Sequence, residues 1–150
     1  MYYHNNNYIV MFFIMLISGL FSTMNVWVDK YQDIRWGLND LYMILLMTGW
    51  MFFFMGVYYK DSCGFLLGLF LIITSLACIR TQFMVTQKQY ISSMVPHHSM
   101  AVHMSRKLLE KNNTISGFLE NLIFSQSKEI EYMNQHENDI PDATTIVIDS

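Results

Sequence analysis

The sequence predicts an all-α protein in which three transmembrane helices precede an antiparallel helical hairpin, and three observations support this fold class. Hydrophobic residues make up 53% of the chain and charged residues only 14%, whereas a soluble domain is about one-quarter charged. No Asp, Glu, Lys or Arg occurs in residues 1–28, 41–59 or 62–79. Beyond these runs, apolar side chains recur every three or four residues, as they do along one face of a helix.

Three apolar runs in the first part of the chain have the length of membrane spans: residues 8–28, 41–59 and 62–79. With a rise of about 1.5 Å per residue, helices of this size cross a hydrocarbon core of roughly 30 Å. A cleaved signal peptide is the alternative for the first run, but no Lys or Arg precedes it and no A-x-A site follows it. We therefore expect residues 1–80 to form a membrane domain whose partner is the lipid bilayer.

The few charged residues carry information about partners and orientation. A net charge of −3 excludes a basic nucleic-acid-binding protein. One side of the predicted spans carries four Lys and Arg residues: Lys30, Arg35, Arg80 and Lys88. The other side carries one, Lys60. By the positive-inside rule, this distribution predicts that the chain after the third span is cytoplasmic.

Residues 81–137 contain two amphipathic helical patterns separated by a turn at residues 111–114. The first pattern comprises Ile91, Met94, Val95, His98, Ala101, Val102, Ser105, Leu108 and Leu109, and the second comprises Phe118, Leu119, Leu122, Ile123, Gln126, Ile130 and Met133. Helices joined by so short a turn lie antiparallel. Reflection about the turn places His98 opposite Glu129 and Met94 opposite Met133. We expect residues 81–137 to form a hairpin and residues 138–150 to be a flexible tail.

Residues 94–104 contain three imidazoles and three thioethers. Met94, His97, Ala101 and Met104 share one face of a helix, and His98 flanks this face toward the second helix. Thioether and imidazole ligands together favour Cu(I), whereas carboxylates favour harder metals. The predicted copper ligands are Met94, His97, His98, Met104 and Met133. The alternative is that the methionines fill a small core and that His98 only hydrogen-bonds Glu129.

Two polar residues of the second helix are expected close to the predicted ligands. Gln126 and Glu129 either orient His97 or His98 or fix the register of the hairpin. The hairpin has no Glu-x-x-His pair of the kind that holds two irons, which argues against a di-iron oxidase. No Ser-His-Asp set, Cys-His pair or phosphate loop occurs either, so we expect no enzymatic activity.

A second set of methionines steps every four residues along the predicted second span: Met43, Met47, Met51 and Met55. Such a ladder could pass Cu(I) across a bilayer by exchange between thioethers. The span is apolar on every side, however, and methionine packs well in lipid or between helices. Packing is therefore the favoured interpretation of this ladder.

Residues 83–133 resemble the bacterial family known as domain of unknown function 305, whose pattern is M-I-x-H-H-x-x-A-x-x-M followed by Q-x-x-E-I-x-x-M. This chain has Met94-Val95-Pro96-His97-His98, Ala101 and Met104, then Gln126, Glu129-Ile130 and Met133, with Val95 in place of the usual isoleucine. Residues 38–43 and 46–51 also resemble multi-pass members of the family. The resemblance implies a ferritin-like helical domain and, for some members, copper binding in the cell envelope.

The sequence therefore favours a membrane-anchored protein that buffers, scavenges or handles Cu(I). An alternative is a non-catalytic assembly module whose polar layer sets register and dimerisation, and a third possibility is copper transport along the methionine ladder. One hairpin buries little apolar surface, so we expect a homo-oligomer or a helical partner that completes a four-helix bundle. The side of the membrane stays open, because thioether sites suit an oxidising compartment whereas the Lys and Arg distribution indicates the cytoplasm.

Overall fold

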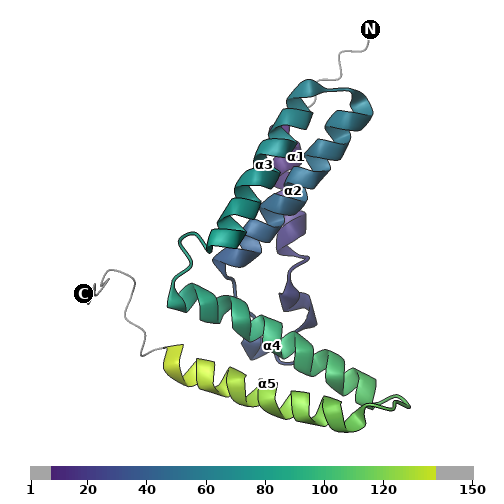
Figure 1. The fold of residues 1–150 in the computed structure, drawn as a ribbon, viewed down its shortest axis with the longest axis vertical. Coiled ribbons are helices and arrows are strands. Elements are labelled where there is room, and N and C mark those ends of the chain that lie inside the picture. The colour runs from purple at the N-terminus through teal and green to yellow at the C-terminus, as the bar shows by residue number, and fades with distance from the viewer. Residues whose placement is uncertain (1–7, 138–150) are drawn as a thin grey trace, which may run out of the picture. The chain divides into compact units, whose positions relative to one another are not determined.

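The computed structural model describes residues 8–137, and this part of the chain contains helices and no strands (Figure 1). The elements are α1 (Tyr8–Leu20), the 3-10 helices η1 (Met24–Trp27) and η2 (Tyr31–Asp33), α2 (Leu38–Tyr59), α3 (Ser62–Thr81), α4 (Gln87–Leu109) and α5 (Ser116–His136). The predicted all-α class is confirmed. The predicted flexible tail, residues 138–150, lies outside the described residues.

The described chain forms two compact units that are not simply successive in the sequence. The first unit contains residues 8–23 and 39–83, and the second contains residues 24–38 and 84–137. Residues 24–38, which join the first two apolar stretches and are here called the interspan segment, fall within the expected membrane domain, residues 1–80. In the structure this segment belongs to the same compact unit as α4 and α5.

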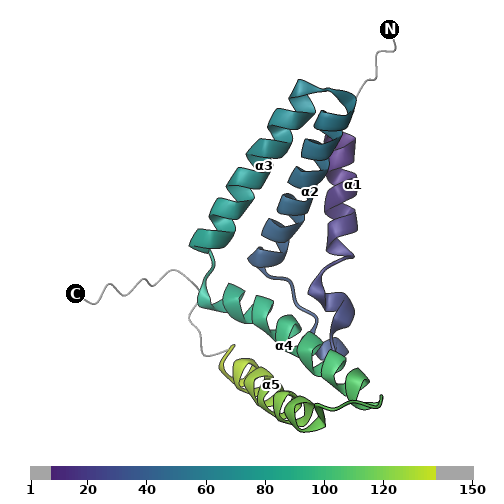
Figure 2. The same ribbon diagram turned by 45° about the vertical axis from the view of Figure 1, so that its right-hand side comes forward.

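In the first unit, α1, α2 and α3 lie side by side (Figure 2). Glycines allow α2 and α3 to approach closely, since a Cβ on Gly68 would lie 2.3 Å from the backbone nitrogen of Phe53. Asp61 caps α3 by accepting hydrogen bonds from the backbone N–H groups of Cys63 and Gly64. The close contact between the two helix backbones and the Asp61 cap together account for the short connection between α2 and α3.

Three stretches are long and apolar enough to cross a membrane, judged by length and composition: Tyr8–Trp27, Leu38–Tyr59 and Ser62–Thr81. The first differs from the expected continuous span over residues 8–28, because α1 ends at Leu20 and only a turn and η1 follow. The Asn25 side chain explains the change in conformation. Its amide group donates to the backbone carbonyl of Arg35 at 2.7 Å, and its oxygen accepts from the Arg35 N–H at 3.0 Å. These bonds make η1 part of the interspan segment.

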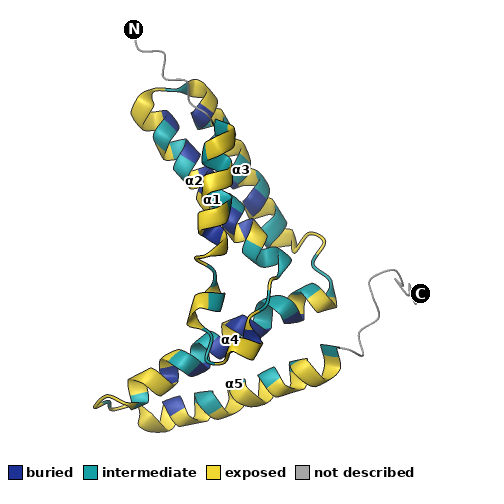
Figure 3. Ribbon diagram, turned by 180° about the vertical axis from the view of Figure 1, so that it is seen from behind, coloured by how far each residue is buried: buried dark blue, intermediate teal, exposed yellow. Residues whose placement is uncertain are grey.

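In the second unit, α4 and α5 pack along one another and are joined by residues 110–115. Their contact buries Val95, Val102 and Leu119, which are at most 4% exposed, whereas most of α5 facing away from α4 is exposed (Figure 3). Thr86 begins α4 as its N-cap, and the helix continues through Pro96. Pro96 is therefore inside the helix and is not its first residue.

The interspan segment covers another side of α4, with contacts from both η1 and η2. The backbone N–H of Leu38 donates to the side-chain oxygen of Gln89 at 2.8 Å. The Arg35 guanidinium donates to Glu137 and to Asn134, both at 2.7 Å. The central helix α4 thus has a partner on each of two sides, and this arrangement positions its histidines.

Candidate metal site

His98 projects from α4 toward α5 and is largely buried. Its Nδ1 atom lies 2.9 Å from a carboxylate oxygen of Glu129, and 12% of its side chain is exposed. The two atoms are close, but they do not form an aligned hydrogen bond. Burial lowers the pKa of His98, the neighbouring His97 lowers it further, and the Glu129 carboxylate opposes this by raising it. The net effect is a lowered pKa, so His98 is neutral at pH 7, as a metal ligand must be.

Met133 shares a surface pocket with this pair. His98 and Glu129 line the pocket together with Met133, Lys128 and Tyr132. The Lys128 ammonium is held 4.4 Å from the centre of the Phe124 ring, and no ion pair between Lys128 and Glu129 occurs in the described part of the chain. An imidazole, a thioether and two carboxylates, those of Glu129 and Glu131, therefore border the same space.

His97 points in a different direction from His98, because successive residues on a helix are separated by about 100°. Its ring centre lies 6.0 Å from that of His98, and the side chain is exposed. The Nδ1 atom of His97 lies 3.4 Å from the sulfur of Met24 in η1. Metal–ligand bonds of about 2.0 Å to nitrogen and 2.3 Å to sulfur would close this separation with an angle of about 104°, near the tetrahedral value. The same separation is that of an N–H···S hydrogen bond, and it also fits two ligands of one tetrahedral ion.

The structure distributes the predicted ligands over more than one place. His98 and Met133 line one pocket, and His97 contacts Met24. Met94 is half-buried on α4, and Met104 is 53% exposed on the same helix. Within residues 8–137, no group of three or more His, Cys, Asp or Glu side chains is placed to hold a metal. Any site here therefore depends on thioether sulfur.

Met24 was not identified from the sequence, although it is the residue that contacts His97. It stands near the end of the first apolar run, where methionine is an ordinary hydrophobic residue. Its role depends on the interspan segment packing against α4, a contact between residues 73 positions apart. Helical periodicity carries no signal for such a contact.

The remaining predicted residues take the following positions. Gln126 is half-buried on α5. Along α2, Met43 and Met47 are about half exposed, at 47% and 48%, while Met51 and Met55 are half-buried. The ladder therefore begins on the outside of the helix group and continues with partly covered side chains. Its use in transport stays a prediction.

These features define an all-α protein that combines long apolar helices with a polar helical unit rich in methionine and histidine. The chain belongs to the family described as Domain of unknown function (DUF305), which matches residues 74–137. It is also similar to an uncharacterized protein of Acanthamoeba polyphaga mimivirus, with 37% identity over 138 residues, covering 87% of this chain and 91% of that protein. No solved structure matches the chain. The resemblance drawn from the sequence motifs is confirmed at the level of this family.

Proposed function

We propose that the protein is a membrane-anchored Cu(I)-binding protein that buffers, scavenges or hands on copper without catalysing a reaction. The observation that carries the proposal is the 3.4 Å approach of His97 Nδ1 to Met24 Sδ. Both are soft or borderline donors from segments far apart in the sequence, and their spacing suits one ion. His98 and Met133, which line a common pocket, would supply a second pair of donors.

The charge of the donor set favours Cu(I) over divalent ions. Neutral imidazole and thioether ligands leave a charge of +1 on bound Cu(I) but +2 on bound Zn²⁺. The smaller charge carries the lower desolvation cost wherever such donors are partly buried, as His98 is. Two carboxylates line the pocket with His98, and Glu129 is the one that contacts it, so the pocket has too few for the oxygen-rich shells of hard metals. The candidate ligands are therefore Met94, His97, His98, Met104 and Met133, with Met24 added by the structure.

Membrane anchoring is supported by the three apolar stretches and by the chain segments that make up the second unit. The interspan segment precedes α2, and α4 follows α3, yet the two belong to one compact unit. They must therefore lie on the same side of any membrane. Two crossings, by α2 and α3, satisfy this condition, because an even number of crossings returns the chain to the side from which it left.

The test is Cu(I) affinity of the full chain in lipid nanodiscs, measured by competition with a coloured Cu(I) chelator. We expect His97→Ala and Met24→Leu each to weaken binding at least tenfold, and His97→Ala with His98→Ala to abolish most of it. Met84→Leu is the matched control, because Met84 is an exposed methionine of the same unit, at 72% exposure, with no contact to either histidine among those described. Unchanged affinity in the double histidine variant would refute the proposal.

A second candidate function is a non-catalytic assembly module. It is supported by large exposed side chains of α5, where Phe118 and Phe124 are each 62% exposed. A second copy of the chain, or another helical partner, would cover such side chains. Sedimentation in detergent separates the two functions. A folded oligomer that is insensitive to copper and binds none supports the module, whereas stoichiometric copper binding supports the first proposal.

Two further predictions are tested in cells and in vesicles. A C-terminal reporter that matures only in oxidising or only in reducing surroundings shows on which side the second unit lies. If the methionines of α2 carry copper across the bilayer, replacing Met47 and Met51 by leucine should block copper uptake into vesicles. Normal uptake by this variant would leave packing as the role of the ladder.

A further inference from the structure

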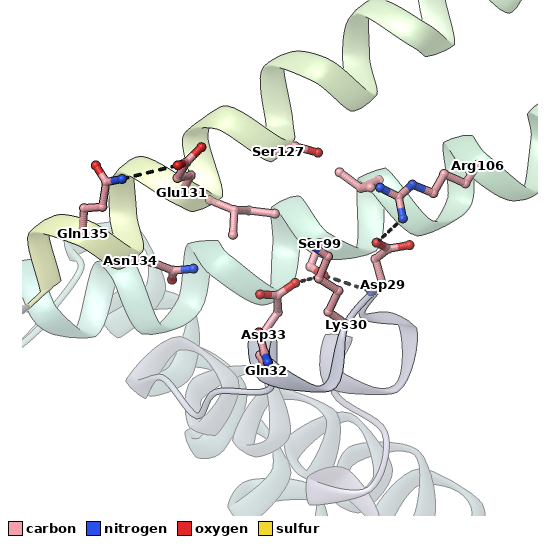
Figure 4. Close-up of a pocket in the computed structure, with 12 residues that line it drawn as sticks. Asp29, Lys30, Gln32, Asp33, Ser99, Arg106, Ser127, Glu131, Asn134 and Gln135 are labelled. Carbon is pink, nitrogen blue, oxygen red and sulfur yellow. Dashed lines mark hydrogen bonds and ion pairs between the residues drawn. The ribbon is translucent and has the colours of Figure 1, made fainter.

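A buried carboxylate at the end of η2 has no cationic partner among the described residues. Asp33 is 5% exposed, and one of its oxygens accepts a hydrogen bond of 2.6 Å from the Ser99 hydroxyl (Figure 4). Ser99 is fully buried, and its oxygen accepts from the backbone N–H of Asp29 at 2.9 Å. The single hydroxyl proton is thus given to one oxygen of Asp33, and no donor to the other oxygen occurs among the described contacts.

Two neighbouring arginines form ion pairs with carboxylates other than that of Asp33. Arg106 pairs with Asp29 at 2.7 Å, and Arg35 pairs with Glu137 at 2.7 Å. Lys30 lines the same cavity as Asp33, but the two form no ion pair in the structure. A buried charge without a counter-ion is costly, so the second oxygen of Asp33 is a site at which a cation would be stabilised.

This oxygen faces a cavity of about 440 Å³ within the second unit, a volume typical of small-molecule sites. Polar side chains from the interspan segment and α5 surround it, namely Gln32, Ser127, Glu131, Asn134 and Gln135. Val102 and Ile130 add an apolar surface. The charges of Asp29 and Arg106 cancel. The remaining charged groups of the lining are two carboxylates, Asp33 and Glu131, and one ammonium, that of Lys30. The lining thus has an excess negative charge.

We propose that this cavity binds a small aliphatic amine, with one ammonium group on the free oxygen of Asp33 and the methylene chain against Val102 and Ile130. An ammonium is favoured over a divalent metal ion, because hard cations need six or more oxygen ligands and no suitable group of three acidic or His side chains occurs in residues 8–137. Cu(I) is disfavoured because no sulfur lines the cavity. The site is therefore chemically distinct from the Met and His donors.

The test is calorimetric titration of the copper-free full chain in nanodiscs with 1,4-diaminobutane. The uncharged 1,4-butanediol, which has the same chain length, serves as the ligand control. We expect saturable binding of the diamine and none of the diol. Asp33→Asn retains an oxygen that can accept from Ser99 but removes the charge, and it should weaken diamine binding at least tenfold.

Lys30→Gln provides a second test that does not depend on a buried residue, because Lys30 is exposed. It removes a competing ammonium from the cavity lining and should tighten diamine binding several-fold. Failure of the wild-type chain to bind the diamine, equal binding of the diol, or unchanged affinity in both variants would each overturn the proposal. Displacement of the diamine by Ca²⁺ at stoichiometric concentration would also overturn it, because the site would then be a metal site.

Discussion

Replacing Ser99 by alanine should both destabilise the second unit and weaken copper binding, although Ser99 is not a proposed ligand. The substitution removes the donor to Asp33 and the acceptor of the Asp29 N–H. Leaving a partly buried N–H unsatisfied costs about 1 kcal/mol, and losing a hydrogen bond to a charged group costs about 1.5–3 kcal/mol. The expected loss in free energy of unfolding is therefore about 2.5–4 kcal/mol. Loss of these two bonds weakens the attachment of the interspan segment to α4, which the Arg106–Asp29 pair and the Leu38–Gln89 bond still hold, and we therefore expect Met24 to lie less closely against His97.

Chemical denaturation of the full chain in detergent, followed by Trp fluorescence, measures the loss of stability. Hydrogen exchange adds a local readout, because the backbone amides of Asp29 and Asp33 should lose protection before those of α5. Ser125→Ala is the control, since Ser125 is exposed and its hydroxyl bonds only a carbonyl within α5. If Ser99→Ala unfolds within about 0.5 kcal/mol of the wild type, with unchanged amide protection, the proposed role of this network is wrong.

Two more predictions concern the pH dependence and the helix contacts. The lowered pKa of His98 means that the folded state binds a proton there less readily than the unfolded state does. The contribution of His98 to the free energy of unfolding is therefore complete above pH 6.5 and falls as the pH drops below it. Denaturation between pH 7.5 and 5 should show this decrease, and His98→Gln should reduce it. Gly68→Ala should cost about 1–3 kcal/mol, because the new Cβ meets the Phe53 backbone at 2.3 Å. Gly117→Ala should stabilise α5 by about 0.5–1 kcal/mol, because a Cβ added at Gly117 has no neighbouring atom within 4 Å. Equal shifts of the unfolding temperature in the two glycine variants would contradict the packing argument.

The parts of the fold that could be predicted are those encoded by local patterns. Uncharged apolar runs predicted the helices at α2 and α3 within three residues, and the apolar spacing after residue 81 predicted α4 and α5. Reflection about the turn placed His98 opposite Glu129, and in the structure the two side chains are 2.9 Å apart. Such contacts follow from helix geometry and loop length, and both can be inferred from the sequence.

The position of the interspan segment could not be predicted, because single polar contacts fix it. Asn25 shortens the first helical stretch by bonding the backbone of Arg35, and Asp33 is buried by bonding Ser99. In the sequence, each of these residues is an ordinary polar residue of a loop. The consequence for the site is substantial, because the contact between Met24 and His97 exists only when this segment lies on α4.

The second unit separates two kinds of chemistry, and this separation bears on metal selectivity. Several of its carboxylate oxygens are bonded to cations or hydroxyl groups, as Asp29 is to Arg106, Glu137 to Arg35 and one oxygen of Asp33 to Ser99. The sulfur of Met24 and the nitrogen of His97 have no carboxylate among their described contacts. A divalent ion that approached these donors would therefore lack the anionic oxygens that stabilise its charge, whereas Cu(I) needs none. The polar contacts that hold the interspan segment on α4 thus bring the sulfur of Met24 close to His97, at a place where the described contacts include no carboxylate.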